Sequence, residues 1–112
     1  MAHITITPAA KTVTVTAAGE TVATSANALE LREGSYPPVL YIPKHDIDMG
    51  RLARTATRSH CPHKGDASYW TISTANNAIT DAGWSCDAPF DAVAEIKDHI
   101  AFYPSKGRIE AN

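Results

Sequence analysis

The sequence lacks the excess of positive charge that proteins binding nucleic acid non-specifically carry. Its 10 lysine and arginine residues are outnumbered by 12 aspartate and glutamate residues, and the formal net charge of the 112-residue chain is −2. Non-specific binding to nucleic acid normally leaves a basic footprint on the domain. We therefore expect no nucleic-acid partner.

Long apolar runs are absent as well. The runs in this chain are far shorter than the ~20 apolar residues that cross a bilayer as a helix. The N-terminal stretch MAHITITPAAKTVTV alternates apolar and polar residues and has no apolar core of a signal peptide. The two cysteines, Cys61 and Cys86, suit a reducing compartment, where thiols do not form a disulfide framework. We therefore expect a cytoplasmic protein with no membrane partner.

The alternation of apolar and polar residues predicts a series of short strands. Val13 and Val15, followed by Gly19-Glu20 and Val22, have a period of two around a glycine-containing turn, which predicts a hairpin. Apolar and β-branched stretches predict further strands at 4–6, 26–31, 39–42, 52–59, 66–73 and 78–85.

One helix is predicted after Pro89. Phe90, Val93, Ile96 and Ile100 recur at intervals of three and four residues, which places them on one side of a helix. Residues 100–104 are expected to form a last strand or the end of the helix, and residues 106–112 a tail. The strands lie too close in sequence for helical crossovers between parallel pairs. We therefore expect one domain over residues 1–112, mainly β with one minor helix, in small antiparallel sheets.

The densest group of reactive side chains is HCPHKG at residues 60–65. Lys64 supplies an ammonium group, and Gly65 leaves a bare backbone that a ligand can approach closely. Successive backbone N–H groups of this kind hold anions. Tyr69 and Trp70 follow on a predicted strand, so one ring faces the core and the other is free to contact a ligand. The pattern predicts a site for a small polar or anionic ligand.

A metal site is one alternative for this segment. His60, Cys61 and His63 carry zinc-binding groups, and Cys86 or His45 would be a fourth ligand. Neighbouring residues on an extended chain point to opposite faces of a sheet, however, and the chain has no C-x-x-C pair. We therefore expect no metal and no other cofactor.

An enzyme with a nucleophilic Cys61 is another alternative. A nearby lysine or protonated histidine favours the thiolate, which is the reactive form of cysteine, and a histidine would act as its base. Lys64 and Glu33 are the other catalytic candidates. Free cysteines are more often small packing residues. Arg54 and Arg58, which would share a face of the strand before this segment, are interpreted as a solvated edge that discourages aggregation.

Several stretches of the chain also match a known family. They are GETVATSANALELRE, YPPVLYIPKHDI, HCPHKGDASYW, DAGWSCDAP and EIKDHIAFY, which together extend from about Gly19 to Tyr103. The pattern CPxKGxAxYW, at residues 61–70, is the most specific of them. In these stretches the chain resembles the domain of unknown function family 427, small and mainly bacterial proteins that are sometimes labelled nucleotidyltransferase-like.

The resemblance implies a compact β-rich domain of the β-tent type, in which two small antiparallel sheets lean together. Some β-tent relatives hold zinc on paired cysteines, which this chain lacks. Cys86 replaces an aromatic residue expected after Trp84-Ser85, and Gly34 replaces a threonine in the element that keeps Glu33 and Pro37. The nucleotidyltransferase label is not matched by a phosphate-binding loop or by paired carboxylates.

These observations lead to three hypotheses. The leading one is a small-molecule ligand site formed by the segment at 61–65 and by groups that the fold brings near it. The second is an enzyme that uses Cys61. The third is an interaction module whose edge strand pairs with another chain, including a second copy in a homo-oligomer. The expected ligand-binding residues are Lys64, Gly65, His63, Glu33, Tyr41, Tyr69 and Trp84, with Cys61 beside them.

Overall fold

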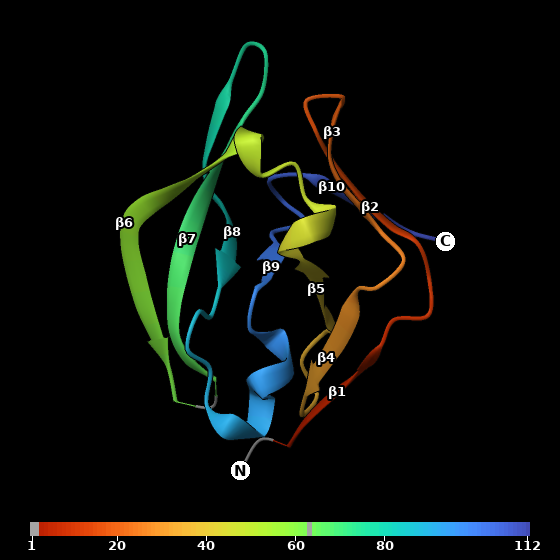
Figure 1. Ribbon diagram of the computed structural model, residues 1–112, viewed down its shortest axis with the longest axis vertical. Coiled ribbons are helices and arrows are strands. Elements are labelled where there is room, and N and C mark those ends of the chain that lie inside the picture. The colour runs from red at the N-terminus through yellow and green to blue at the C-terminus, as the bar shows by residue number, and fades with distance from the viewer. Residues whose placement is uncertain (1–2, 63) are drawn as a thin grey trace.

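The computed structural model describes residues 3–62 and 64–112, and it arranges them in two antiparallel sheets (Figure 1). The larger sheet has seven strands in the order β1-β4-β5-β9-β8-β7-β6, and the smaller has three in the order β10-β2-β3. The predicted fold class, mainly β in antiparallel sheets, is confirmed, and the β-tent arrangement stays a prediction. The strands are β1 (Ile4–Pro8), β2 (Val13–Ala17), β3 (Glu20–Ser25), β4 (Leu29–Glu33), β5 (Val39–Pro43), β6 (Leu52–Cys61), β7 (Gly65–Ser73), β8 (Ala78–Ser85), β9 (His99–Phe102) and β10 (Arg108–Ala111).

The predicted hairpin at the start of the chain is confirmed. β2 and β3 pair antiparallel, with Ala17 opposite Glu20. The two residues between them, Ala18 and Gly19, have φ angles of 50° and 79°. Positive φ at both central positions is the backbone of the tight turn that matches the twist of paired strands, and glycine adopts it without strain. A second turn connects β7 and β8, where the Thr74 N–H donates to the Asn77 carbonyl at 2.8 Å.

The helical part is shorter than the apolar pattern indicates. It comprises three short 3₁₀ segments, η1 (Lys44–Asp46), η2 (Met49–Arg51) and η3 (Asp91–Ile96). η3 is kinked at Val93, whose φ and ψ are −128° and 28°. Ile100, which the spacing places on the helix, lies in β9 and pairs with Ile42 of β5, so the last-strand alternative holds for residues 100–102. Strand pairing has therefore overridden the local three- and four-residue spacing. In the part of the chain that the structure describes, no helix is long and apolar enough to span a membrane.

The prediction of a C-terminal tail is also wrong, because a strand, β10, forms there. β10 pairs with β2, and Ile109 lies opposite Val15. An edge strand tolerates charge on its solvent side, because only alternate side chains face the core.

Alternate residues of the seven-stranded sheet face two different environments. On one face, here called the closed face, Trp70 and Ile42 pack with the buried valines of β2 and β3. On the other, the open face, Tyr41 and its neighbours pack with Val93 and Ile96 of η3. In Figure 1, η3 lies at one end of the molecule, away from β2, β3 and β10. The open-face cluster consists of Leu31, Tyr41, Ala67, Cys86, Val93, Ile96 and Ala101, with Tyr69 and Trp84 among the partly buried residues against it.

Candidate functional site

A row of paired residues on the open face sets up the candidate site. Tyr69 lies opposite Trp84, Trp84 opposite Ala101, and Ala101 opposite Tyr41. Because the alanine between them is small, the Trp84 Nε1–H reaches across and donates to the Tyr41 hydroxyl at 3.2 Å. The two rings meet edge to face, with centroids 6.4 Å apart. This is a favourable geometry for aromatic pairs, so the row holds Trp84 in a defined position.

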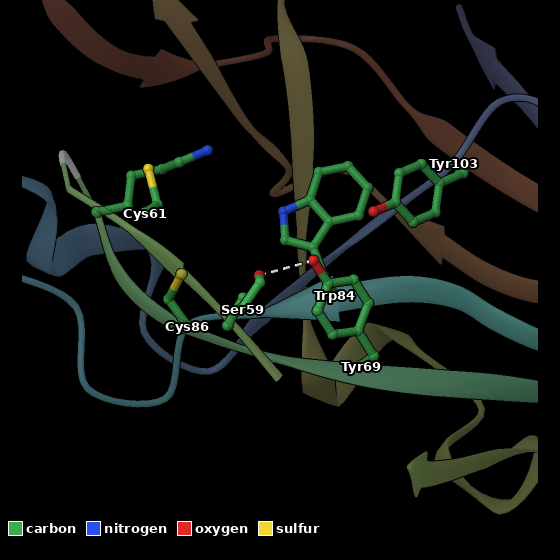
Figure 2. Close-up of a pocket in the computed structure, with 8 residues that line it drawn as sticks. Ser59, Cys61, Tyr69, Trp84, Cys86 and Tyr103 are labelled. Atoms are coloured by element: carbon green, nitrogen blue, oxygen red, sulfur yellow. Dashed lines mark hydrogen bonds between the residues drawn. The ribbon is translucent and has the colours of Figure 1, made fainter. Parts of the chain in front are cut away.

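A cavity of about 190 Å³ opens beside this row. Figure 2 shows the two cysteines together at one end of it, and Trp84 beside Tyr103 at the other. β6, β7 and β8 supply most of the lining, and Tyr103 follows directly after β9. The lining residues are Ser59, Cys61, Lys64, Ala67, Tyr69, Trp84, Cys86 and Tyr103.

Hydroxyl groups and rings form one wall of the cavity. The Ser59 and Tyr69 hydroxyls are 2.8 Å apart (Figure 2). The ring of Tyr103 lies 4.5 Å from that of Trp84, measured between centroids. Burial, followed by a hydrogen bond with Tyr69, raises the pKa of Tyr103 to about 12. Its hydroxyl therefore keeps its proton at neutral pH and can serve as a donor.

Lys64 supplies the only charged side chain among the described residues that line the cavity. Burial acts to lower the pKa of Lys64, but its interactions with Tyr41, Cys61 and Glu33 outweigh burial, and the pKa is raised. The side chain is therefore an ammonium ion at neutral pH. Its backbone is anchored on both sides, because the Phe90 N–H donates to the Lys64 carbonyl at 2.9 Å and the Lys64 N–H to the Cys61 carbonyl at 3.2 Å.

Three of the predicted ligand residues do not line the cavity. Tyr41 is fully buried under Trp84, and burial raises the pKa of its hydroxyl. Glu33 ends β4, and its negative charge acts on Lys64. Gly65 has a φ of 118°, and a β-carbon there would lie 3.3 Å from the Ala88 carbonyl oxygen. The glycine is thus required for the close approach of two chain segments. A fourth predicted residue, His63, lies outside the described residues.

Two hydroxyl-bearing lining residues are not among those predicted from the sequence. Ser59 lies two residues before Cys61 on β6, and Tyr103 two residues after Ala101 of β9. A spacing of two on a strand places side chains on the same face. This signal was present for both residues, but it becomes informative only when the face that holds the cavity is known.

With this geometry established, the chain can be compared with known proteins. The family described as Domain of unknown function (DUF427) matches residues 5–112. The chain belongs to this family. A search of curated proteins finds no match. The match covers nearly the whole of this DUF427 protein, including every residue that lines the cavity.

The histidine before Cys61 points away from the cavity of this DUF427 protein. His60 lies opposite Asp66, and its Nδ1 is 2.7 Å from a carboxylate oxygen of that residue, on the exposed side. His60 therefore serves neither as a base for Cys61 nor as a co-ligand with it. Residues 3–62 and 64–112 contain no group of three or more His, Cys, Asp or Glu side chains placed to hold a metal ion.

The arginines of β6 are engaged elsewhere in the DUF427 fold. Arg54 lies over the Trp70 ring, 4.6 Å from its centroid, and donates to Asp87 at 2.5 Å. Arg58 folds back onto its own strand, donating to the carbonyls of Thr55 and Thr57 at 2.6 and 2.8 Å. The register of β6 shifts between the two arginines, so their four-residue spacing does not make them one surface. Neither lines the cavity.

Proposed function

We propose that this protein binds a small polar or anionic molecule in the cavity around Lys64. The observation that carries the proposal is the placement of one ammonium group in a concave site whose other described lining residues include no Asp, Glu, Arg or His. A lysine in such a site keeps its charge while losing part of its hydration. An anion would replace the lost hydration with a charge-assisted hydrogen bond.

The other lining groups suit the same ligand. The hydroxyls of Ser59, Tyr69 and Tyr103 can donate to oxygen atoms, and the Trp84 ring offers a flat apolar surface. The described lining residues include no carboxylate that would repel an anion. Glu33 interacts with the Lys64 charge from outside the lining. We expect it to adjust the strength of anion binding and not to contact the ligand.

The cavity also limits the size of what it holds. Its volume of about 190 Å³ is smaller than the roughly 300–1,000 Å³ of pockets that enclose drug-sized ligands. A carboxylate or phosphate group with few attached atoms fits this volume, whereas a nucleotide does not.

Calorimetry and thermal shift with simple anions test the proposal. We would titrate inorganic phosphate, sulfate, acetate and benzoate into wild type and Lys64→Gln at constant ionic strength, because free salt screens exposed charges. At least one anion should stabilise wild type. Its affinity should fall about tenfold or more in Lys64→Gln, because a hydrogen bond to a charged group contributes about 1.5–3 kcal/mol.

Lys11→Gln is the matched control. Lys11 is exposed and lies between β1 and β2, outside the cavity, so this variant removes the same charge without touching the site. It should bind each anion as wild type does. The proposal is wrong if no anion stabilises wild type more than Lys64→Gln, or if Lys11→Gln loses as much affinity.

A further inference from the structure

A second, larger cavity lies on the other side of Trp84. Its volume is about 550 Å³, and its described lining residues carry no charged side chain. Tyr36, one of its lining residues, is 71% exposed. Apolar surface of this kind on a small protein marks a place where something binds. The lining residues are Tyr36, Pro37, Pro38, Val39, Leu40, Trp84, Phe102, Pro104 and Ile109.

This cavity forms because two neighbouring strands separate. β5 and β9 are paired only from Tyr41 to Pro43 on the β5 side, so Val39 and Leu40 lie beyond the ladder between these strands. Prolines flank the strands where they diverge, with Pro37 and Pro38 before β5 and Pro104 after β9. Proline has no N–H to donate and cannot extend a ladder. The positions of these prolines in the sequence therefore determine where the strands separate.

Trp84 is common to the two cavities, since it lines both. Consecutive residues at the end of β9 repeat this arrangement, because Tyr103 lines the polar cavity and Phe102 and Pro104 line the apolar one. We propose that the ligand is amphipathic: its anionic head lies against Lys64, and an apolar chain or ring passes over Trp84 into the cavity beside Tyr36. This inference rests on the proposed function, because it extends the same site.

The occupant is assigned as the tail of the ligand because the apolar cavity and the polar one share Trp84 in their lining. The polar cavity is too small to enclose more than a head group. A tail that leaves the polar cavity along Trp84 would reach the apolar lining on the same residue. Burying that tail would account for the exposed Tyr36 ring, which otherwise contacts water over most of its surface.

A series of straight-chain carboxylates tests this extension. We would measure the affinities of acetate, butyrate, hexanoate and octanoate by calorimetry, all below their micellar concentrations. Wild type should bind successively longer acids more tightly, by up to about fourfold for each added methylene, as apolar burial predicts. Tyr36→Ser should bind acetate as tightly as wild type, but its affinity should increase less with the chain length of the acid. Because Tyr36 is largely exposed, this change should leave folding intact.

Two further variants complete the design. Phe90→Ser removes the other exposed large apolar ring, 45% exposed and outside both cavities, and should behave as wild type. Lys64→Gln should lower the affinity for every acid by a similar factor, and the affinity should still increase with chain length. That combined pattern supports one continuous amphipathic site.

The alternatives give different results. An affinity that depends on Lys64 but not on chain length overturns this inference and leaves the proposed function standing. Loss of the Lys64 dependence for phosphate and for the short acids overturns the proposed function itself. If octanoate binds Lys64→Gln as tightly as wild type, the apolar cavity is a separate site and the inference fails. It also fails if sedimentation detects a dimer that Tyr36→Ser dissociates, because a second copy then occupies the cavity.

Discussion

The two tryptophans of this chain occupy opposite faces of one sheet and have different surroundings. Trp70, on the closed face, is 7% exposed, and its Nε1–H donates to the buried Ser85 hydroxyl at 2.9 Å. Lys44 and Arg54 lie over its ring, 5.3 and 4.6 Å from the centroid. Trp84, on the open face, is partly exposed and borders two cavities. The closed face thus satisfies its polar groups internally, whereas the open face leaves polar groups available beside a hollow.

The difference follows from what covers each face. The three-stranded sheet supplies buried side chains from β2 and β3 across the closed face. η3, only six residues long, covers the open face with two buried side chains, Val93 and Ile96. A short, kinked segment cannot cover a seven-stranded sheet. The cavity around Lys64 lies in the part of the open face that η3 leaves uncovered, and the shortening of the predicted helix is therefore linked to the presence of this cavity.

The largest effect should come from removing the ring on the closed face. Trp70→Ala should lower the free energy of unfolding by about 3–5 kcal/mol, as large-to-small changes of buried aromatics do. Trp84→Ala should cost clearly less, because part of its ring is already in contact with solvent. Urea denaturation of both variants measures the two losses. An equal or larger loss for Trp84→Ala would mean that the open face is as structural as the closed face.

Much of this comparison could be anticipated from the sequence. Alternation predicted that Tyr69 and Trp70 face opposite ways, and the structure places Tyr69 at the cavity and Trp70 in the core. The adjacency of His60 and Cys61 likewise predicted that the two side chains would diverge, as they do. Both inferences are local, because they need only the two-residue period of a strand.

The remaining features depend on contacts between distant segments. Nothing in the sequence near Tyr41 indicates that Trp84 will bond to it, since 43 positions separate the two residues and the small Ala101 lies between them in the sheet. The sequence predicts that Gly65 offers bare backbone to an anion, but the side on which a β-carbon would stand faces the Ala88 carbonyl oxygen. Strand order decides such contacts, and it is set by pairing over long sequence separations that no local pattern encodes.

An intermediate effect is expected at Asp87, which ties the closed face to β6. Partial burial acts to raise its pKa, but Arg54, Lys44 and Ser85 outweigh burial and lower the pKa below its ordinary value. A lowered pKa in the folded state stabilises the protein above the unfolded pKa of about 3.9. This stabilisation is lost as the pH falls through the folded pKa.

Asp87→Asn tests this contribution. Because the Asp87 side chain is 41% exposed, we expect a loss on the order of 1 kcal/mol or less at neutral pH. The difference in free energy of unfolding between wild type and Asp87→Asn should be constant from neutral pH down to about pH 5. It should disappear below about pH 4, where the wild-type carboxylate takes up its proton. Urea unfolding at several pH values measures it, with the exposed Asp91→Asn as the control. A gap that persists at the lowest pH would contradict the ionic origin of the effect.

The smallest effect on stability, but the clearest contrast within the open face, should come from modifying its cysteines. Cys61 is partly exposed at the cavity, whereas Cys86 is buried. Burial also raises the pKa of the Cys86 thiol, so less of it is present as the reactive thiolate. Iodoacetamide added to the folded protein should therefore label Cys61 and leave Cys86 unmodified until urea is added. Peptide mass spectrometry measures both sites, and Cys61→Ser should abolish native labelling. Equal labelling of the two thiols in the folded protein would mean that the reagent reaches Cys86 through the cavity, which would contradict the burial of that residue.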